Sequence, residues 1–193
     1  MVNMDIYQLT DDFAYKTFTI IGEKVEYITL NGQPLIGSWK EKQGEVYKNY
    51  DNKGKRDGFD ARICGGLFVM EKEKAILFVQ RTNVKAELLP FKIINVKKDF
   101  VFINILNIVK SINFEGISPI KLGELTRNND LYFYEEAGEN ILFRDALYTN
   151  MLYCTKELEN IINELDIKGL ALKKVGKVAP LPVFPKERNI FNR

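Results

Sequence analysis

The chain has 193 residues, of which 46% are hydrophobic and 28% charged, and its net charge is +2. A chain of this size buries roughly 70% of the surface of its unfolded state, so it folds without disulfides or metals. No apolar run approaches the ~20 residues of a membrane span, and the acidic residues near the start do not match the apolar core of a signal peptide. We therefore expect one cytoplasmic domain over residues 1–193, with no membrane partner. It divides into subdomains at 1–60, which is strand-rich, and 61–193, which is α+β.

The chain contains no histidine. This excludes Ser-His-Asp and Cys-His catalysis, HExxH sites and His-ligated metals together. The two cysteines, Cys64 and Cys154, lack CxxC spacing and argue against a disulfide scaffold or a zinc ribbon. No basic stripe interleaved with aromatic residues is present, which argues against a nucleic-acid partner. We predict no metal and no cofactor, and an enzyme would have to use carboxylates, lysine or tyrosine.

The first sixty residues have the pattern of short strands joined by turns. Residues 16–21 and 24–30 are rich in β-branched and aromatic side chains and predict two strands. Asn31-Gly32 predicts a turn. Trp39, the single tryptophan, is expected to anchor the core rather than to bind a partner. Residues 40–60 are polar and contain several glycines, which predicts a linker or mobile loop.

From residue 61 onward the pattern is more regular. Residues 67–69 predict a strand. The side chains expected on the inward face of the helix that follows are Ala75, Ile76, Leu77 and Val79. Residues 86–96 predict an edge or irregular strand because they include Pro90. Residues 100–112 begin as an extended aromatic run and change to a helical period, with Asn104 as a candidate helix cap. Residues 131–145 predict a β-hairpin around a polar turn.

Two segments resemble each other at a spacing of 85 residues: "LFVMEKEKAILF" (67–78) aligns with "LYCTKELENIIN" (152–163). Both continue into a second strand, which gives an approximate repeat of 67–94 and 152–175. True duplication and chance similarity both remain open. In this alignment Cys154 takes the position of Val69, so we expect it to be a packing residue rather than a nucleophile at a helix start. Thr155 is a candidate helix cap, and Lys168-Gly169 would end the helix.

The remaining acidic and glycine motifs do not form a recognisable catalytic site. The adjacent pairs Asp11-Asp12 and Glu135-Glu136 would point to opposite faces of an extended chain, so neither is an acid–base dyad. Asp166-Ile167-Lys168 has the letters of a nuclease element but falls at a predicted helix end. Gly65-Gly66 precedes a strand, whereas a dinucleotide-binding loop follows one.

The polar turn of the predicted hairpin, "EEAGEN", supplies the candidate partner-binding residues Glu135, Glu136 and Glu139. A compact acidic projection of this kind can steer a basic partner and speed association. The alternative interpretation is a solvated hairpin tip without a partner.

The order of these segments resembles a family of bacterial immunity proteins that is named after a myxobacterial member, a former domain of unknown function attached to polymorphic toxin systems. Members show an aromatic residue and two spaced asparagines before a hydrophobic residue, here within 102–109. A hydrophobic-Phe-Arg strand follows at 142–144, and then a strand–Thr–helix–Gly unit at 152–170. The resemblance covers nearly the whole chain. It departs at Lys110 and Asn113, where many members have aspartates.

This resemblance implies a non-catalytic immunity protein that binds and neutralises a cognate toxin encoded by a neighbouring gene. The alternative hypothesis is an uncharacterised cytoplasmic enzyme that depends on carboxylates or on lysine and tyrosine, motivated by "YFYEEAGEN". For the fold we expect an α+β protein. Its strand-rich N-terminal part would be followed by two strand-helix-strand units and a β-hairpin around a shared core.

Overall fold

The computed structural model describes residues 4–22, 30–48, 52–64 and 66–184. Within these residues the chain forms twelve β-strands in two six-stranded sheets, together with three α-helices. The predicted α+β class is therefore confirmed. The strand predicted at 24–30 lies, except for its last residue, outside the described residues.

The first sheet combines the N-terminal strand with five strands from the second half of the chain. Its strands are β1 (Met4–Asp11), β8 (Ile108–Val109), β9 (Leu131–Phe133), β10 (Leu142–Asp145), β11 (Tyr153–Cys154) and β12 (Leu170–Val178). They lie in the order β8-β10-β11-β1-β12-β9.

The second sheet is built from residues 18–105. Its strands are β2 (Phe18–Ile21), β3 (Lys42–Val46), β4 (Ala61–Cys64), β5 (Leu67–Glu71), β6 (Ala86–Ile94) and β7 (Phe100–Ile105). They lie in the order β2-β3-β6-β7-β5-β4. The first sixty residues do not form a sheet of their own, because β1 pairs with β11 and β12 whereas β3 pairs with β6.

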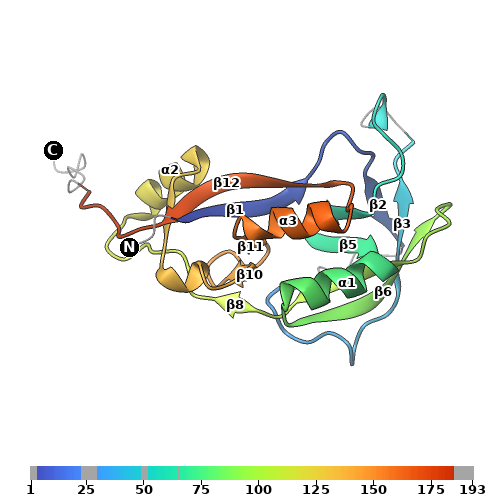
Figure 1. Cartoon of the computed structure of the whole chain (residues 1–193), viewed down its shortest axis with the longest axis horizontal. Coiled ribbons are helices and arrows are strands. Elements are labelled where there is room, and N and C mark those ends of the chain that lie inside the picture. The colour runs from blue at the N-terminus through green and yellow to red at the C-terminus, as the bar shows by residue number, and fades with distance from the viewer. Residues whose placement is uncertain (1–3, 23–29, 49–51, 65, 185–193) are drawn as a thin grey trace.

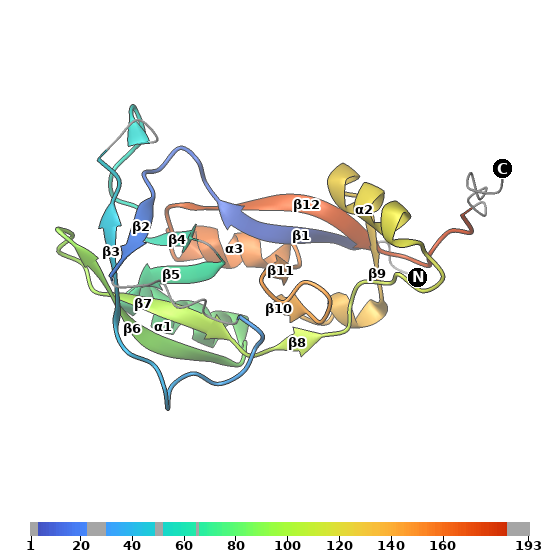
Figure 2. The same cartoon turned by 180° about the vertical axis from the view of Figure 1, so that it is seen from behind.

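Two of the helices lie on one side of the two sheets. The helices are α1 (Lys72–Thr82), α2 (Pro119–Asn128) and α3 (Glu157–Glu164). α1 and α3 contact each other and lie in front of the strands in Figure 1 and behind them in Figure 2. One hydrophobic cluster joins both helices to both sheets and includes Phe68, Phe78, Cys154 and Leu158. α2 lies at the far end of the first sheet, near the N-terminus of the chain (Figure 1).

The two sheets share a topology over five strands. β4-β5-β7-β6-β3 and β10-β11-β1-β12-β9 have the same pairing directions in sequence, three antiparallel pairs and then one parallel pair. In each sheet a helix connects two parallel strands that lie on either side of a central strand. That central strand is β7, directly after β6, in one sheet and β1, from the other end of the chain, in the other sheet. The similarity of 67–94 and 152–175 thus corresponds to a shared arrangement of strands.

The residue alignment at a spacing of 85 is wrong by one position. Cys154 faces the cluster around α1 and α3, as Met70 does, whereas Val69 faces the opposite side of its sheet. A shift of one residue in a strand moves every side chain to the other face. Two of the four residues predicted on the inward face of α1 are not there, since Ile76 and Leu77 are 40% and 47% exposed. Ala75 is buried as predicted and Val79 packs against the main cluster, and the other interior positions are taken by Phe78 and Thr82.

Three further predictions about local structure are wrong. Residues 100–112 form β7 and β8 rather than a helix, and Asn104 is not a cap, because its Nδ2 donates to Gln33 O and Glu87 Oε2. β9 and β10 do not form a hairpin, since β11, β1 and β12 lie between them. The predicted loop at 40–60 contains β3. α2 is an additional helix, whose first turn is capped by the Ser118 Oγ that accepts the Lys121 N–H.

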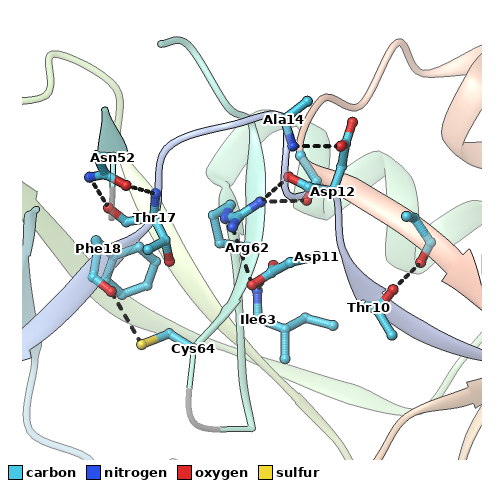
Figure 3. Close-up of polar contacts among 12 residues, drawn as sticks. Thr10, Asp11, Asp12, Ala14, Thr17, Phe18, Asn52, Arg62, Ile63 and Cys64 are labelled. Atoms are coloured by element: carbon cyan, nitrogen blue, oxygen red, sulfur yellow. Dashed lines mark hydrogen bonds and ion pairs between the residues drawn. The ribbon is translucent and has the colours of Figure 1, made fainter. Parts of the chain in front are cut away.

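The two sheets are joined at a seam where β4 meets β1 and the residues before β12. Arg62 on β4 is 1% exposed, and its Nη1 donates to the carbonyl oxygens of Asp12 at 2.7 Å and Gly169 at 3.2 Å (Figure 3). Its Nη2 lies 3.3 Å from a carboxylate oxygen of Asp11. The other oxygen of Asp11 accepts the backbone N–H of Ile63 at 2.7 Å. One buried guanidinium group thus holds strands of both sheets.

Gly169 allows the chains at this seam to come close together. Its φ is +105°, and a Cβ added there would lie 2.3 Å from the carbonyl oxygen of Ala61. A side chain at this position is therefore excluded both by backbone conformation and by space. The prediction that Gly169 ends α3 is wrong, because α3 ends at Glu164. Thr155 makes no side-chain cap to this helix.

A second buried charge lies beside this glycine. Asp60 is 3% exposed and accepts hydrogen bonds from Lys74 Nζ at 2.8 Å, Lys98 Nζ at 2.6 Å and the backbone N–H of Lys168 at 3.0 Å. Burial by itself raises the pKa of the Asp60 carboxyl group. The hydrogen bonds from the two lysines and from the backbone outweigh burial and hold its pKa at about 2, below the ordinary 3.8.

This depressed pKa predicts an acid-labile seam. Because the folded-state pKa lies below the unfolded value, the stabilisation is present above pH ~4 and is lost as the pH falls toward 2. Asp60→Asn should lower the free energy of unfolding at pH 7. Its deficit relative to the wild type should then shrink by about 2 kcal/mol between pH 7 and pH 2. Urea unfolding of both proteins across this range measures the difference.

Asp57→Asn is the matched control for this experiment, because Asp57 pairs with Lys16 at the surface and its side chain is 82% exposed. We expect it to unfold as the wild type does at every pH. A deficit for Asp60→Asn that stayed constant with pH would contradict the assignment.

The shared topology predicts that the first sheet tolerates a new chain order. Met4 pairs with Val178, so the start of β1 lies beside the end of β12. Joining these residues through five residues reproduces the β6–β7 connection, which spans residues 95–99. A permuted chain that runs from Ala14 to Val178, through this linker and then from Met4 to Phe13, should give the wild-type circular dichroism spectrum and unfold cooperatively.

A chain of residues 14–178 without β1 is the control for the permuted chain. It should fail to unfold cooperatively, because the centre of the first sheet is then missing. If the permuted chain behaved like this control, β1 would not be interchangeable with a strand that follows β12.

Candidate protein-binding surface

The three candidate glutamates lie on a short turn that crosses the first sheet from the edge strand β9 to β10, the strand next to the other edge. The turn includes the 3-10 helix η2 (Glu135–Ala137) and connects β9 to β10. Glu135, Glu136 and Glu139 are all exposed, whereas Ala137 is fully buried. Ala137 packs into a cluster with Ile6, Phe133 and Tyr153, on the face of the sheet opposite α3. The predicted acidic projection therefore exists, although on a crossing turn instead of a hairpin tip.

Hydrogen bonds fix the conformation of this turn. The backbone N–H groups of Ala137 and Gly138 donate to the carbonyl oxygens of Tyr134 and Glu135 at 3.1 and 2.9 Å. Asn140 Nδ2 donates to the carbonyl oxygen of Glu136 at 2.7 Å. Asn107 Nδ2 in turn donates to Asn140 Oδ1 at 2.8 Å and ties the turn to the segment between β7 and β8. The backbone that carries the glutamates is thus held before any partner binds.

A pocket of about 450 Å³ opens beside this turn. The described residues that line it are Met4, Asn113, Phe133, Tyr134, Glu135, Gly138, Glu139, Val178, Ala179 and Pro180. Most of these side chains are apolar, and the charged ones are both glutamates. Gly138 allows the turn to pack closely against the Met4 side chain, because a Cβ at Gly138 would lie 3.2 Å from Met4 Sδ.

The carboxylates of the turn are available for a partner. Glu135, Glu136 and Glu139 make no side-chain hydrogen bond or ion pair with the described part of the chain. The nearest lysine along β12, Lys177, lies with its Nζ 5.5 Å from the centre of the Tyr132 ring. Three negative charges and an apolar pocket thus form one surface, which we call the acidic-pocket face.

The other acidic candidates have structural roles or lie apart. Asp11 and Asp12 do not face each other: Asp11 binds Arg62 and Ile63, whereas Asp12 Oδ1 accepts the backbone N–H of Ala14 (Figure 3). Burial raises the pKa of Asp11, against the lowering effect of the Ile63 N–H and of Arg62. Asp166 and Lys168 form an exposed ion pair at 3.5 Å.

Sequence reasoning did not identify the apolar half of this face or the asparagines that hold it. Met4 and Val178 meet because β1 pairs with β12, and this pairing of distant segments is not visible in either local sequence. Asn107 is part of a pattern that the sequence shows, since it is the second of the spaced asparagines at 102–109, but the pattern does not indicate its hydrogen-bond partner. Its role depends on Asn140, which lies 33 residues further along the chain.

The chain matches no model of a known protein family and no curated protein. Across the described residues, no helix has the length and apolar character that crossing a bilayer requires. The same residues contain no group of three or more cysteine, aspartate or glutamate side chains arranged to hold a metal ion.

Cys154 is 0% exposed in the main hydrophobic cluster, and burial strongly raises the pKa of its thiol. A protonated, inaccessible thiol is a poor nucleophile. In a Cys64→Ser background, Cys154 should react with a thiol reagent about 100-fold more slowly in the folded protein than in urea. Cys154→Val should fold with a Tm within a few degrees of the wild type. Rapid, complete labelling of the folded protein would show instead that the thiol is accessible.

Proposed function

We propose that this protein is a non-catalytic immunity protein that binds and neutralises a cognate bacterial toxin, as its resemblance to such proteins implies. The acidic-pocket face is the observation that supports binding best. An apolar pocket supplies a place for an anchoring side chain, and anchors of this kind carry much of the affinity of protein interfaces. The unpaired carboxylates supply long-range attraction to a basic partner, which raises the association rate.

The fixed turn also favours tight binding. Affinity is reduced when side chains and loops must be ordered at the moment of association. The hydrogen bonds of Asn140 with Glu136 and Asn107 remove part of this cost in advance. The enzyme alternative has no comparable support: among the described residues the carboxylate whose pKa is raised is Asp11, and Arg62 and Ile63 hold it at the seam.

Co-expression with the toxin domain encoded by the neighbouring gene tests this function. We expect colony formation to return to the level seen without toxin, and the purified proteins to form a stable complex with a nanomolar Kd. An inactive toxin variant separates binding from toxicity, and an empty vector is the control for rescue. Absence of both rescue and binding would refute the proposal.

A further inference from the structure

We infer that the partner inserts an apolar side chain into the pocket beside Met4 and Phe133 and places lysine or arginine side chains against Glu135 and Glu139. The partner surface is thus a basic segment with an apolar anchor. This inference rests on the proposed function and names the chemistry of the toxin surface.

The volume and lining of the pocket support an apolar anchor. About 450 Å³ lies within the range of pockets that hold compact apolar groups, and one aromatic or large aliphatic side chain fits inside it. The floor is formed by the ends of β1, β9 and β12, which supply Met4, Phe133 and Val178. Phe133 and Val178 are buried and belong to the same cluster as Ala137. A side chain that enters the pocket therefore meets a fixed apolar wall.

Charge complementarity specifies what surrounds the anchor. The pocket is lined by two glutamates although the chain as a whole carries a net charge of +2. Two lysines on neighbouring elements are engaged elsewhere: Lys177 lies over the Tyr132 ring, and Lys121 pairs with Glu124 at 3.1 Å and lies over the Phe184 ring. An anionic or neutral segment would leave Glu135 and Glu139 without a counter-charge, whereas a basic segment neutralises them.

The alternative occupant within the chain is the segment after Phe184, which contains Lys186, Arg188, Phe191 and Arg193. The described chain passes the pocket at Ala179 and Pro180. It then continues to Phe184, whose ring packs against Tyr132 at 6.5 Å between centroids. The direction of the described chain therefore leads from the pocket toward α2, and we commit to the toxin as the occupant.

Two variants test the two halves of the surface. The double variant Glu135→Lys with Glu139→Lys reverses the charges beside the pocket. The variant Ala179→Trp places a large side chain in the pocket, because residue 179 is half-buried in its lining. The N–H of residue 179 keeps its hydrogen bond to the Phe133 carbonyl oxygen in this variant. Each should weaken toxin binding by about tenfold or more. The charge-reversal variant should lose its affinity mainly through a slower association rate, and its difference from the wild type should shrink as salt is added.

The matched control makes the same change in net charge on another face. Glu157→Lys with Glu164→Lys alters two exposed glutamates of α3 and should change the Kd by no more than about twofold. Circular dichroism and thermal unfolding establish that each variant is folded. If one variant fails to fold, Pro180→Trp replaces Ala179→Trp, and Glu135→Gln with Glu139→Gln replaces the charge reversal.

The outcomes separate this inference from the proposed function. If the wild-type protein neither binds nor rescues, the proposed function fails, and this inference fails with it. If the wild type binds and the folded variants bind equally well, the inference is overturned while the function stands. If a chain ending at Phe184 binds the toxin more tightly than the full chain, the C-terminal segment occupies the pocket and the inference is also overturned.

Discussion

The fold depends on one buried guanidinium group at the seam between its two sheets. Moving Arg62 out of water costs several kcal/mol, which is offset only when its donors are matched by well-placed acceptors. Here the carbonyl oxygens of Asp12 and Gly169 accept from Nη1 and the carboxylate of Asp11 lies against Nη2, whereas the buried Nε has no hydrogen-bond partner among the described residues. Asp11 ends β1, Asp12 follows it and Gly169 precedes β12, whereas Arg62 belongs to β4 of the second sheet. Because the donor and its acceptors belong to different sheets, Arg62 meets them only when both sheets are in place, and the seam favours one relative placement of the sheets.

Much of the fold could be predicted because strand patterns are local, but strand partners are not. The runs at 131–133 and 142–145 were identified as strands from their composition, yet a polar turn between them does not reveal that three other strands lie between the two. β7 was partly misread since all six of its residues are buried, so no alternation marks it as a strand. The alignment of Cys154 with Val69 failed for a related reason. Two segments can be aligned with an error of one residue and still look similar. In a strand, however, the same error assigns each side chain to the wrong face of the sheet.

The acidic part of the candidate site could be predicted from the sequence, but its apolar pocket could not. A cluster of glutamates in a turn is visible in the sequence, and exposure follows from its polarity. The pocket beside it is not visible, because its wall joins Met4 to Val178 across almost the whole chain. The rigidity of the turn depends in the same way on Asn107 and Asn140. Both are ordinary polar residues until the strands on either side bring them within hydrogen-bonding distance.

The position of β1 has a consequence for how the chain folds during synthesis. All strands of the second sheet lie within residues 18–105, so that sheet can assemble while the ribosome is still producing the remainder. β1 leaves the ribosome long before its neighbours β11 and β12, which lie at 153–154 and 170–178. The strand at the centre of the first sheet must therefore wait with both edges unpaired until residues 153–178 have been translated. Unpaired strand edges are prone to aggregation, so the order of translation leaves β1 exposed to this risk for most of the synthesis of the first sheet.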